Sequence, residues 1–163
     1  MRLPRSVESD PRAERLRDRL SRDARPLWSG GSLPVAHLPL GAPLAAALQS
    51  AATARRVRRG LESVTALLDA EARGQGQVDR ASGVARGARI SRLLFVSHDG
   101  AERFYRHVET LLMRHAGRVL GVRLDASAAD LGRLLFGREA IARLVLLDQK
   151  DAVSAALLAI ANA

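Results

Sequence analysis

The alternation of apolar strands with amphipathic helices from Ile90 onward constrains the fold of this chain most strongly. Three short runs, ISRLLFVS, RVLGVRL and AIARLVLLD, read as buried strands. Helix-like segments separate and follow them, at residues 101–116, 127–137 and 150–161. Strands that alternate with helices favour a sheet covered on both faces. We therefore predict an α/β fold, a three-layer α/β/α sandwich with a small, mostly parallel sheet.

The segment before this alternation reads as helical and belongs to the same domain. Residues 44–56 are rich in alanine, a strong helix former. Gly60 interrupts the pattern, and residues 61–72 then place Leu61, Val64, Leu67 and Leu68 at helical spacing. Residues 73–87 are rich in glycine and polar side chains and read as a long loop. The predicted sandwich domain therefore spans residues 44–163.

Residues 1–43 differ in composition and are predicted to form a flexible N-terminal extension. Residues 11–25 alternate opposite charges and contain few apolar positions, so any helix there has little to bury. Residues 26–43 are rich in proline and glycine, which is typical of a loop or linker. We expect Trp28, the only tryptophan, to dock this segment onto the domain.

The charge of the chain predicts attraction to polyanions. The formal net charge is +9, and Lys150 is the only lysine among 26 basic residues. RNA, DNA and an anionic membrane surface all fit this charge, although a GC-rich genome also produces an arginine excess. There is no cysteine, which excludes disulfides and cysteine-bound zinc. No stretch reaches the roughly 20 apolar residues of a membrane helix, so we expect a cytoplasmic protein without a membrane partner.

Acidic residues follow the predicted strands and are the main candidates for catalysis. Asp99, Asp125 and Asp148 stand at strand ends, where an open α/β sheet binds ligands. Such carboxylates hold Mg²⁺ and phosphate in some sites, and in others they cap the following helix. No metal-binding spacing of histidines, no phosphate-binding glycine loop and no nucleophile elbow is present. We therefore assign no catalytic residue, metal or cofactor, and keep open a small Rossmann-like enzyme that uses Asp99 and Asp125.

Clustered arginines offer a second candidate site. Four of them precede the helix predicted at residues 61–72, and three flank the first strand: Arg55, Arg56, Arg58 and Arg59, then Arg86, Arg89 and Arg92. Packed side by side, they would form one patch that grips phosphates through bidentate contacts and helix N–H groups. The alternative is an arginine face that is merely solvated. Aromatic residues make up only 3% of the chain, which favours structured RNA over stacked single strands.

The order of these elements resembles the L-seven-Ae/L-thirty-e superfamily of kink-turn RNA-binding ribosomal proteins. The segments that carry the resemblance are ARRVRRGLESVTALL, RISRLLFVSHD and SAADLGRLLFGREAIARLVLLD, within about residues 44–150. The resemblance implies RNA contacts through two segments: Arg58, Arg59, Gly60, Leu61, Glu62 and Ser63, then Arg138, Glu139, Ala140 and Ile141. It implies a non-catalytic RNA-binding protein, with the ribosome or translation factors as partners. Because domains of release factors are similar and mainly contact proteins, a protein-interaction module is the alternative.

Overall fold

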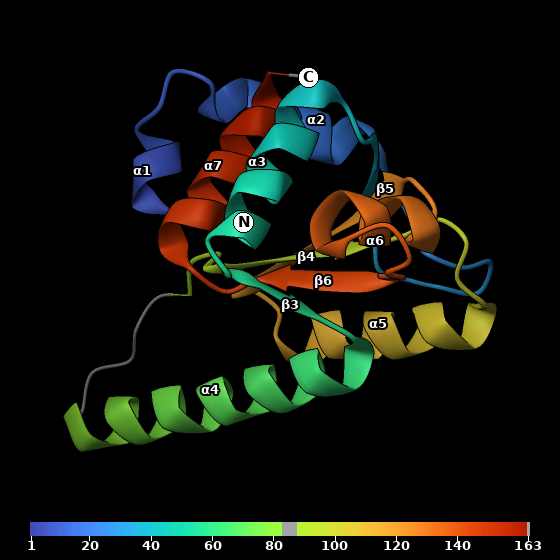
Figure 1. The fold of residues 1–163 in the computed structure, drawn as a ribbon. Coiled ribbons are helices and arrows are strands. Elements are labelled where there is room, and N and C mark those ends of the chain that lie inside the picture. Colours follow the sequence, from blue (N-terminus) through green and yellow to red (C-terminus); the bar gives the residue numbers. More distant parts are fainter. Residues whose placement is uncertain (83–87, 163) are drawn as a thin grey trace.

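The computed structural model describes residues 1–82 and 88–162, which form three layers. A six-stranded sheet lies between an upper layer of helices α1, α2, α3, α6 and α7 and a lower layer of α4 and α5 (Figure 1). This arrangement confirms the predicted α/β/α sandwich. Within the described residues, no helix combines the length and apolar character needed to cross a bilayer.

The sheet is mixed, and most of its strands share one direction. Its order is β1-β2-β5-β4-β6-β3. β2, β5, β4 and β3 run one way, and β1 and β6 run the other. The strands are β1 Ala24–Arg25, β2 Val35–Pro39, β3 Val57–Arg59, β4 Arg92–Val96, β5 Val119–Asp125 and β6 Leu144–Leu147. β6 runs antiparallel to β4. After α6 the chain returns to the start of that helix, where the Ala142 N–H donates to the Ala128 carbonyl at 2.9 Å, and β6 begins from there.

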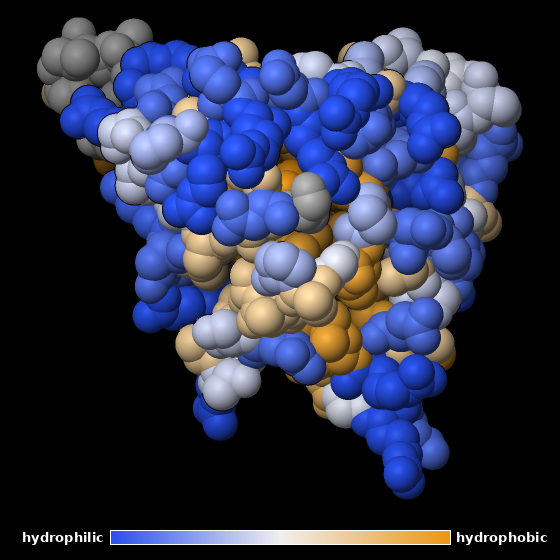
Figure 2. All heavy atoms as spheres, turned by 90° about the horizontal axis from the view of Figure 1, so that it is seen from above, coloured by the Kyte–Doolittle hydropathy of each residue, from blue (hydrophilic) through white to orange (hydrophobic). Residues whose placement is uncertain are grey.

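The upper layer and the sheet share one apolar core. The helices are α1 Arg5–Glu8, α2 Ala13–Arg22, α3 Ala42–Thr53, α6 Ala128–Phe136 and α7 Lys150–Ala161. Phe95, Val122 and Val145 from the sheet are fully buried against this layer. Seen from above, its surface carries an apolar area surrounded by hydrophilic residues (Figure 2). The alanine-rich sequences of α3 and α7 let these two helices pack closely.

The lower layer covers the other face of the sheet with a second core. It consists of α4 Leu61–Ser82 and α5 Glu102–Arg114, with part of the segment before β2. Val64 and Leu68 of α4 pack with Val108 of α5 against Leu94 and Leu146. The helical spacing that predicted an inward face for the start of α4 is thus confirmed.

The N-terminal 43 residues differ from the predicted flexible extension, because they belong to the same core and sheet. β2 pairs with β5 along four residue pairs, and the Ile90 N–H donates to the Arg2 carbonyl at 2.8 Å. α2 packs on α7, with its few apolar side chains on one face. The buried residues of this segment include Leu3, Val7, Leu16 and Leu20. These few apolar side chains suffice to hold the segment in place because all four are buried in the core.

Two further boundaries differ from the sequence prediction. α3 ends at Thr53 with Arg55 in the left-handed conformation (φ 57°), and the chain then forms β3 rather than a turn. α4 continues to Ser82 through the segment predicted as a loop. Its glycines each cost about 1 kcal/mol in a helix, but the alanine, glutamate, arginine and glutamine around them are good helix formers. Arg86 lies outside the described residues.

Candidate nucleic-acid interface

The two segments implied by the resemblance meet at one edge of the sheet. β3 lies next to β6, and the Gly60 N–H donates to the Leu144 carbonyl at 3.0 Å. The Arg59 guanidinium lies over the Phe136 ring at the end of α6, 4.6 Å from the ring centroid. Residues 59–63 and 137–141, far apart in sequence, are therefore neighbours in space. We call residues 59–63 and 137–141 together the junction surface.

Gly60 allows the sharp entry of the chain into α4. Its φ of +94° is a conformation that residues with a Cβ rarely adopt. The Val64 N–H donates to the Gly60 carbonyl, so the helix begins directly after this residue. The first N–H groups of α4 have no acceptor inside the helix and point outward at this end. The turn thus exposes backbone donors beside the Arg59 side chain.

The junction surface has exposed side chains of both charges and one exposed apolar residue. Arg59 and Arg138 are exposed, as are Glu62 and Glu139. Ile141 is 61% exposed, a high value for a large apolar side chain. The two glutamates balance the two arginines, so a polyanion bound here would depend on direct contacts with guanidinium and backbone donors rather than on a broad positive field.

Gly132 holds the second segment of the junction surface against α6. A Cβ at Gly132 would overlap the backbone carbonyl of Ala140, and it would lie 2.6 Å from the Ile141 nitrogen. Because the obstacle is backbone rather than a movable side chain, Gly132→Ala must displace residues 140–141 or α6. We expect a loss of about 1–3 kcal/mol in the free energy of unfolding, as for other overpacked sites. Urea unfolding measures this loss, and Arg133→Ala at an exposed position of the same helix serves as the control, with an expected effect within about 0.5 kcal/mol.

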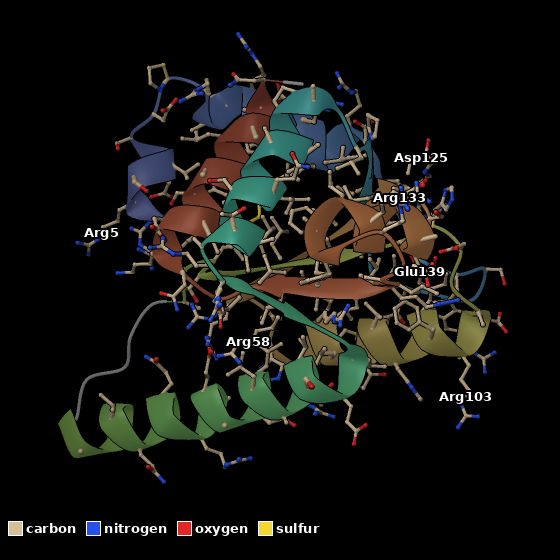
Figure 3. All side chains as sticks on the ribbon, in the orientation of Figure 1. Arg5, Arg58, Arg103, Asp125, Arg133 and Glu139 are labelled. Atoms are coloured by element: carbon tan, nitrogen blue, oxygen red, sulfur yellow. The ribbon has the colours of Figure 1, made fainter. Side chains whose placement is uncertain are left out.

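The other arginines of the sequence cluster do not join this surface. Arg58 and Arg59 are consecutive in a strand, so their side chains leave opposite faces of the sheet. Arg58 pairs with Asp148 at 3.1 Å, well away from Glu139 (Figure 3). Arg56 pairs with Asp151 at the start of α7. The single patch predicted for this cluster is therefore wrong, because strand geometry and two aspartates separate its members.

Arg89 and Arg92 serve the packing of the fold. Arg89 donates to the Leu3 carbonyl at 2.9 Å and pairs with Glu8 at 2.6 Å, which ties down the N-terminus. The hydrogen bond from Arg89 lowers the pKa of Glu8. Arg92 pairs with Glu71 of α4 at 2.9 Å. These two residues are not part of the junction surface.

The acidic residues proposed for catalysis lie at the carboxyl ends of β4 and β5. The helices that follow these strands, α5 and α6, cover opposite faces of the sheet, so their loops diverge at this point (Figure 1). His98 Nδ1 and Asp125 Oδ1 lie 2.9 Å apart across the gap between the strands. Asp99 Oδ1 accepts the Ala128 N–H at 3.0 Å, at the start of α6. In the part of the chain that the structure describes, no group of three or more histidine or acidic side chains is arranged to hold a metal.

Asp99 thus caps α6, and not the helix that follows it in the sequence, α5, as one interpretation of its position expects. Burial raises the pKa of Asp99, but hydrogen bonds from Ser97 and the Ala128 N–H outweigh it and hold the pKa below its usual value. Ser127 Oγ accepts the Asp130 N–H at the same helix end. The Asp99 carboxylate therefore stabilises the fold at neutral pH, and this contribution is lost as the pH falls through its lowered pKa.

Replacement of Asp99 tests this capping role. Asp99→Ala is expected to lower the free energy of unfolding at neutral pH by about 1 kcal/mol, typical of a lost cap. The exposed Asp125→Ala is the matched control, and its effect is expected to stay within about 0.5 kcal/mol. The difference between wild type and Asp99→Ala should shrink in acid. Thermal melts across pH measure it, and an equal loss for both variants would contradict the capping role.

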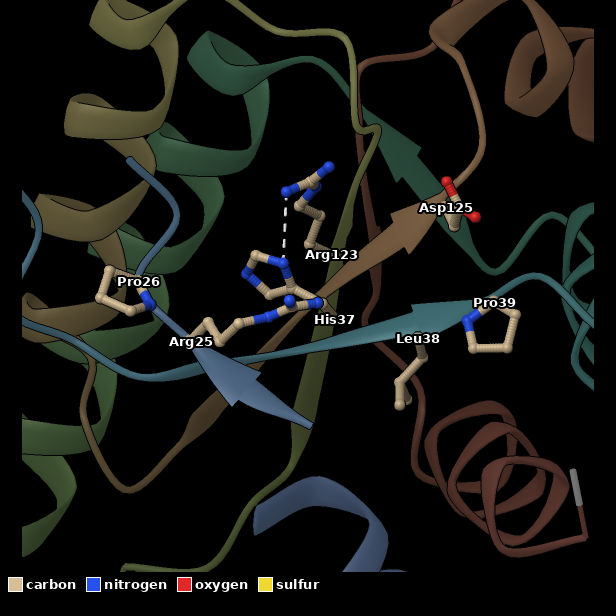
Figure 4. A pocket seen from close by; sticks show the side chains of 7 residues that line it. All are labelled: Arg25, Pro26, His37, Leu38, Pro39, Arg123 and Asp125. Atoms are coloured by element: carbon tan, nitrogen blue, oxygen red, sulfur yellow. Dashed lines mark hydrogen bonds between the residues drawn. The ribbon is translucent and has the colours of Figure 1, made fainter. Parts of the chain in front are cut away.

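The structure also gathers three residues that sequence reasoning did not connect. Arg25, His37 and Arg123 line a pocket of about 470 Å³ beside β1, β2 and β5 (Figure 4). Arg25 and His37 lie in the segment that the sequence predicts to be a flexible N-terminal extension. The sequence therefore does not predict the pairing of β2 with β5 that brings these residues to Arg123. VAHLP is short, does not alternate regularly and is flanked by prolines, so no strong local signal predicts this strand.

Comparison with known proteins supports the fold and leaves the function open. No known protein family and no curated protein matches this chain. A solved structure of a protein with unknown function from Bacillus halodurans is similar in fold, with a TM-score of 0.52 and 17% sequence identity. The match covers 76% of this chain and 100% of that chain. A likeness at this identity shows the fold alone.

Proposed function

We propose that this protein is a non-catalytic RNA-binding protein that contacts structured RNA through the junction surface, in association with the ribosome or translation. It would be a remote member of the L-seven-Ae/L-thirty-e superfamily. The observation that carries the proposal is the meeting of residues 59–63 with residues 137–141 at one sheet edge. The resemblance implies RNA contacts through residues 58–63 and 138–141, and of these only Arg58, which pairs with Asp148, lies outside the junction surface.

The chemistry of the junction surface suits a folded RNA backbone. The Arg59 guanidinium is oriented by the Phe136 ring, which lowers the freedom it would lose on binding a phosphate. Arg138 stands on the neighbouring segment, and the first N–H groups of α4 add backbone donors. Ile141 offers an apolar contact for a sugar or an unstacked base. A shape formed by two separated RNA strands would reach both segments at once.

The order of the elements supports the superfamily assignment. From α3 to α7 the chain runs helix, basic strand with glycine, helix, strand, helix, strand, short helix, strand and helix. The resemblance is based on this order with a basic turn in the place of β3. β1 and β2 extend the sheet beyond β5, and α1 and α2 pack on α7. The net charge of +9 favours an anionic partner.

The salt dependence of RNA affinity tests the proposal. RNA that copurifies with the protein would be sequenced, and a labelled, folded fragment titrated by fluorescence anisotropy. With two arginines on phosphates, we expect the logarithm of the association constant to fall with that of the salt concentration, with a slope of about −2. Absence of bound RNA, or affinity independent of salt, would contradict the proposal.

A protein-interaction module is the second candidate, and the exposed Ile141 favours it. An exposed apolar residue between charged neighbours is typical of a protein contact. In that case Ile141→Asp would abolish partner capture, while Arg59→Glu would weaken it only slightly. RNA binding predicts the reverse order, because the guanidinium carries the phosphate contact.

A further inference from the structure

A pocket on the lower face of the sheet carries positive charge without a bound counter-charge. β1, β2 and β5 each contribute one side chain to it: Arg25, His37 and Arg123. Strand pairing explains their meeting. His37 and Arg123 are direct partners in the ladder, and Arg25 is the partner of Val35, two residues from His37. Because residues two apart in a strand face the same way, all three side chains lie on one face.

The two guanidinium groups flank the imidazole of His37. Arg123 Nη1 lies 3.2 Å from His37 Nδ1, and Arg25 extends along the other side of the ring (Figure 4). A guanidinium only donates hydrogen bonds, so Nδ1 is the acceptor and His37 is neutral in this arrangement. Burial lowers the pKa of His37, and the nearby Arg123 and Arg25 lower it further, while the Arg25 and Pro26 carbonyls oppose this in part.

Among the described residues, no acidic side chain pairs with either of these arginines. Within residues 1–82 and 88–162, neither Arg25 nor Arg123 forms an ion pair with a carboxylate. Asp125 also lines the pocket, where one carboxylate stands against two guanidiniums, and its Oδ1 lies 2.9 Å from His98 Nδ1. By contrast, many other arginines of this structure form an ion pair with a carboxylate, as Arg12, Arg17 and Arg114 do. Two cations held close together in a concave site favour an anion from solution.

We propose that this pocket binds the terminal phosphate of a phosphorylated small molecule, with the phosphoryl group between Arg25 and Arg123. A phosphate monoester carries nearly two negative charges at neutral pH and thus matches two guanidiniums, whereas a carboxylate matches one. The planar forks of both arginines donate to its oxygens in pairs.

The size and lining of the pocket indicate that the ligand has an organic part. Its volume of about 470 Å³ lies in the range of small-molecule sites and exceeds the needs of a bare phosphate. Pro26 and Pro39 stand at its two ends and offer rigid apolar surfaces (Figure 4). Pro39 and Asp125 of its lining are the last residues of β2 and β5, and the carboxyl ends of strands are where α/β sheets commonly bind ligands.

The site is independent of the proposed RNA contact. Arg25, His37 and Arg123 lie on β1, β2 and β5, whereas Arg59 lies on β3 at the far edge of the sheet. Four strand spacings of about 4.8 Å separate β2 from β3 by roughly 20 Å. The two proposals therefore succeed or fail separately.

Titration of the His37 ring resonances by NMR tests the inference. Three probes are added to the full chain in turn: inorganic phosphate, adenosine 5′-monophosphate and adenosine. We expect saturable shifts of the His37 signals with the first two, tighter binding of the monophosphate, and no binding of adenosine. Arg25→Gln and Arg123→Gln should each weaken monophosphate binding about tenfold, the loss of one charge-assisted contact.

Three controls keep the outcome decisive. Arg15→Gln removes one positive charge from the exposed side of α2 and should leave binding unchanged. Arg123→Lys keeps the charge without the fork and should bind more weakly than wild type, while thermal melts show that each variant is folded. A hydroxyl-terminated RNA oligonucleotide and its 5′-phosphorylated form separate the two sources of phosphate. Equal binding of adenosine and its monophosphate, equal effects of Arg15→Gln and Arg123→Gln, or binding of the hydroxyl-terminated RNA alone would overturn the inference.

Discussion

Charge reversal at Arg59 and Arg138 together is expected to abolish most RNA binding. Each substitution replaces a phosphate-binding guanidinium with a carboxylate that repels phosphate, so we expect the affinity to fall at least about a hundredfold at moderate salt. The salt dependence should also become flatter, because fewer counterions are released when the remaining contacts form. Fluorescence anisotropy with the copurified RNA measures both quantities.

The control for this pair is a double charge reversal on the opposite side of the molecule. Arg5 and Arg15 are exposed on α1 and α2, and Arg5 lies far from Glu139 (Figure 3). Arg5→Glu with Arg15→Glu changes the net charge by the same amount. If it weakens RNA binding as much as the junction variant does, the attraction is a property of the whole charge and the junction surface is not the binding site.

Removal of residues 1–43 is expected to prevent cooperative folding. This truncation leaves the sandwich domain that composition alone delimits, but it strips β2 from the edge of β5 and exposes the α7 surface that α2 covers. Leu3, Val7 and Leu16 are fully buried, and losing a single such side chain costs about 2–5 kcal/mol. The sum exceeds the usual stability of a domain of this size. Circular dichroism melts should show no cooperative transition.

A graded variant separates this cause from a general effect of truncation. Leu16→Ala in the full chain should lower the free energy of unfolding by about 2–5 kcal/mol while leaving one cooperative transition. α2 has no exposed leucine that could serve as a control. The control is therefore the exposed Arg15→Ala, with an expected effect within about 0.5 kcal/mol. A stable, cooperative fragment 44–163 would contradict the role of the N-terminal segment.

The C-terminal half of the fold is readable from the sequence because its signals are local. Runs such as RLLFV and LVLL are apolar throughout, as buried strands are, and α5 repeats its apolar residues at helical spacing. The direction of β6 is not readable in this way. It depends on the pairing of β6 with β4 and β3, which are distant in sequence.

The N-terminal half depends on partners that are distant in sequence. VAHLP lies in a proline-rich segment, and only its pairing with β5 makes it a strand. RRVRR reads as a cluster of charge, but β3 turns consecutive arginines to opposite faces, and Asp148 and Asp151 bind two of them. The same distance in sequence hides the Arg25, His37 and Arg123 pocket, since no short motif contains all three residues.

Photo-crosslinking of bound RNA, with mass spectrometry of the crosslinked peptides, tests the central claim most directly. The protein would be irradiated in complex with its copurified RNA, and the same experiment repeated at high salt. The proposed function predicts crosslinks within residues 59–63 and 137–141 that disappear at high salt. Crosslinks confined to α1, α2 or α7, with none on the junction surface, would contradict it.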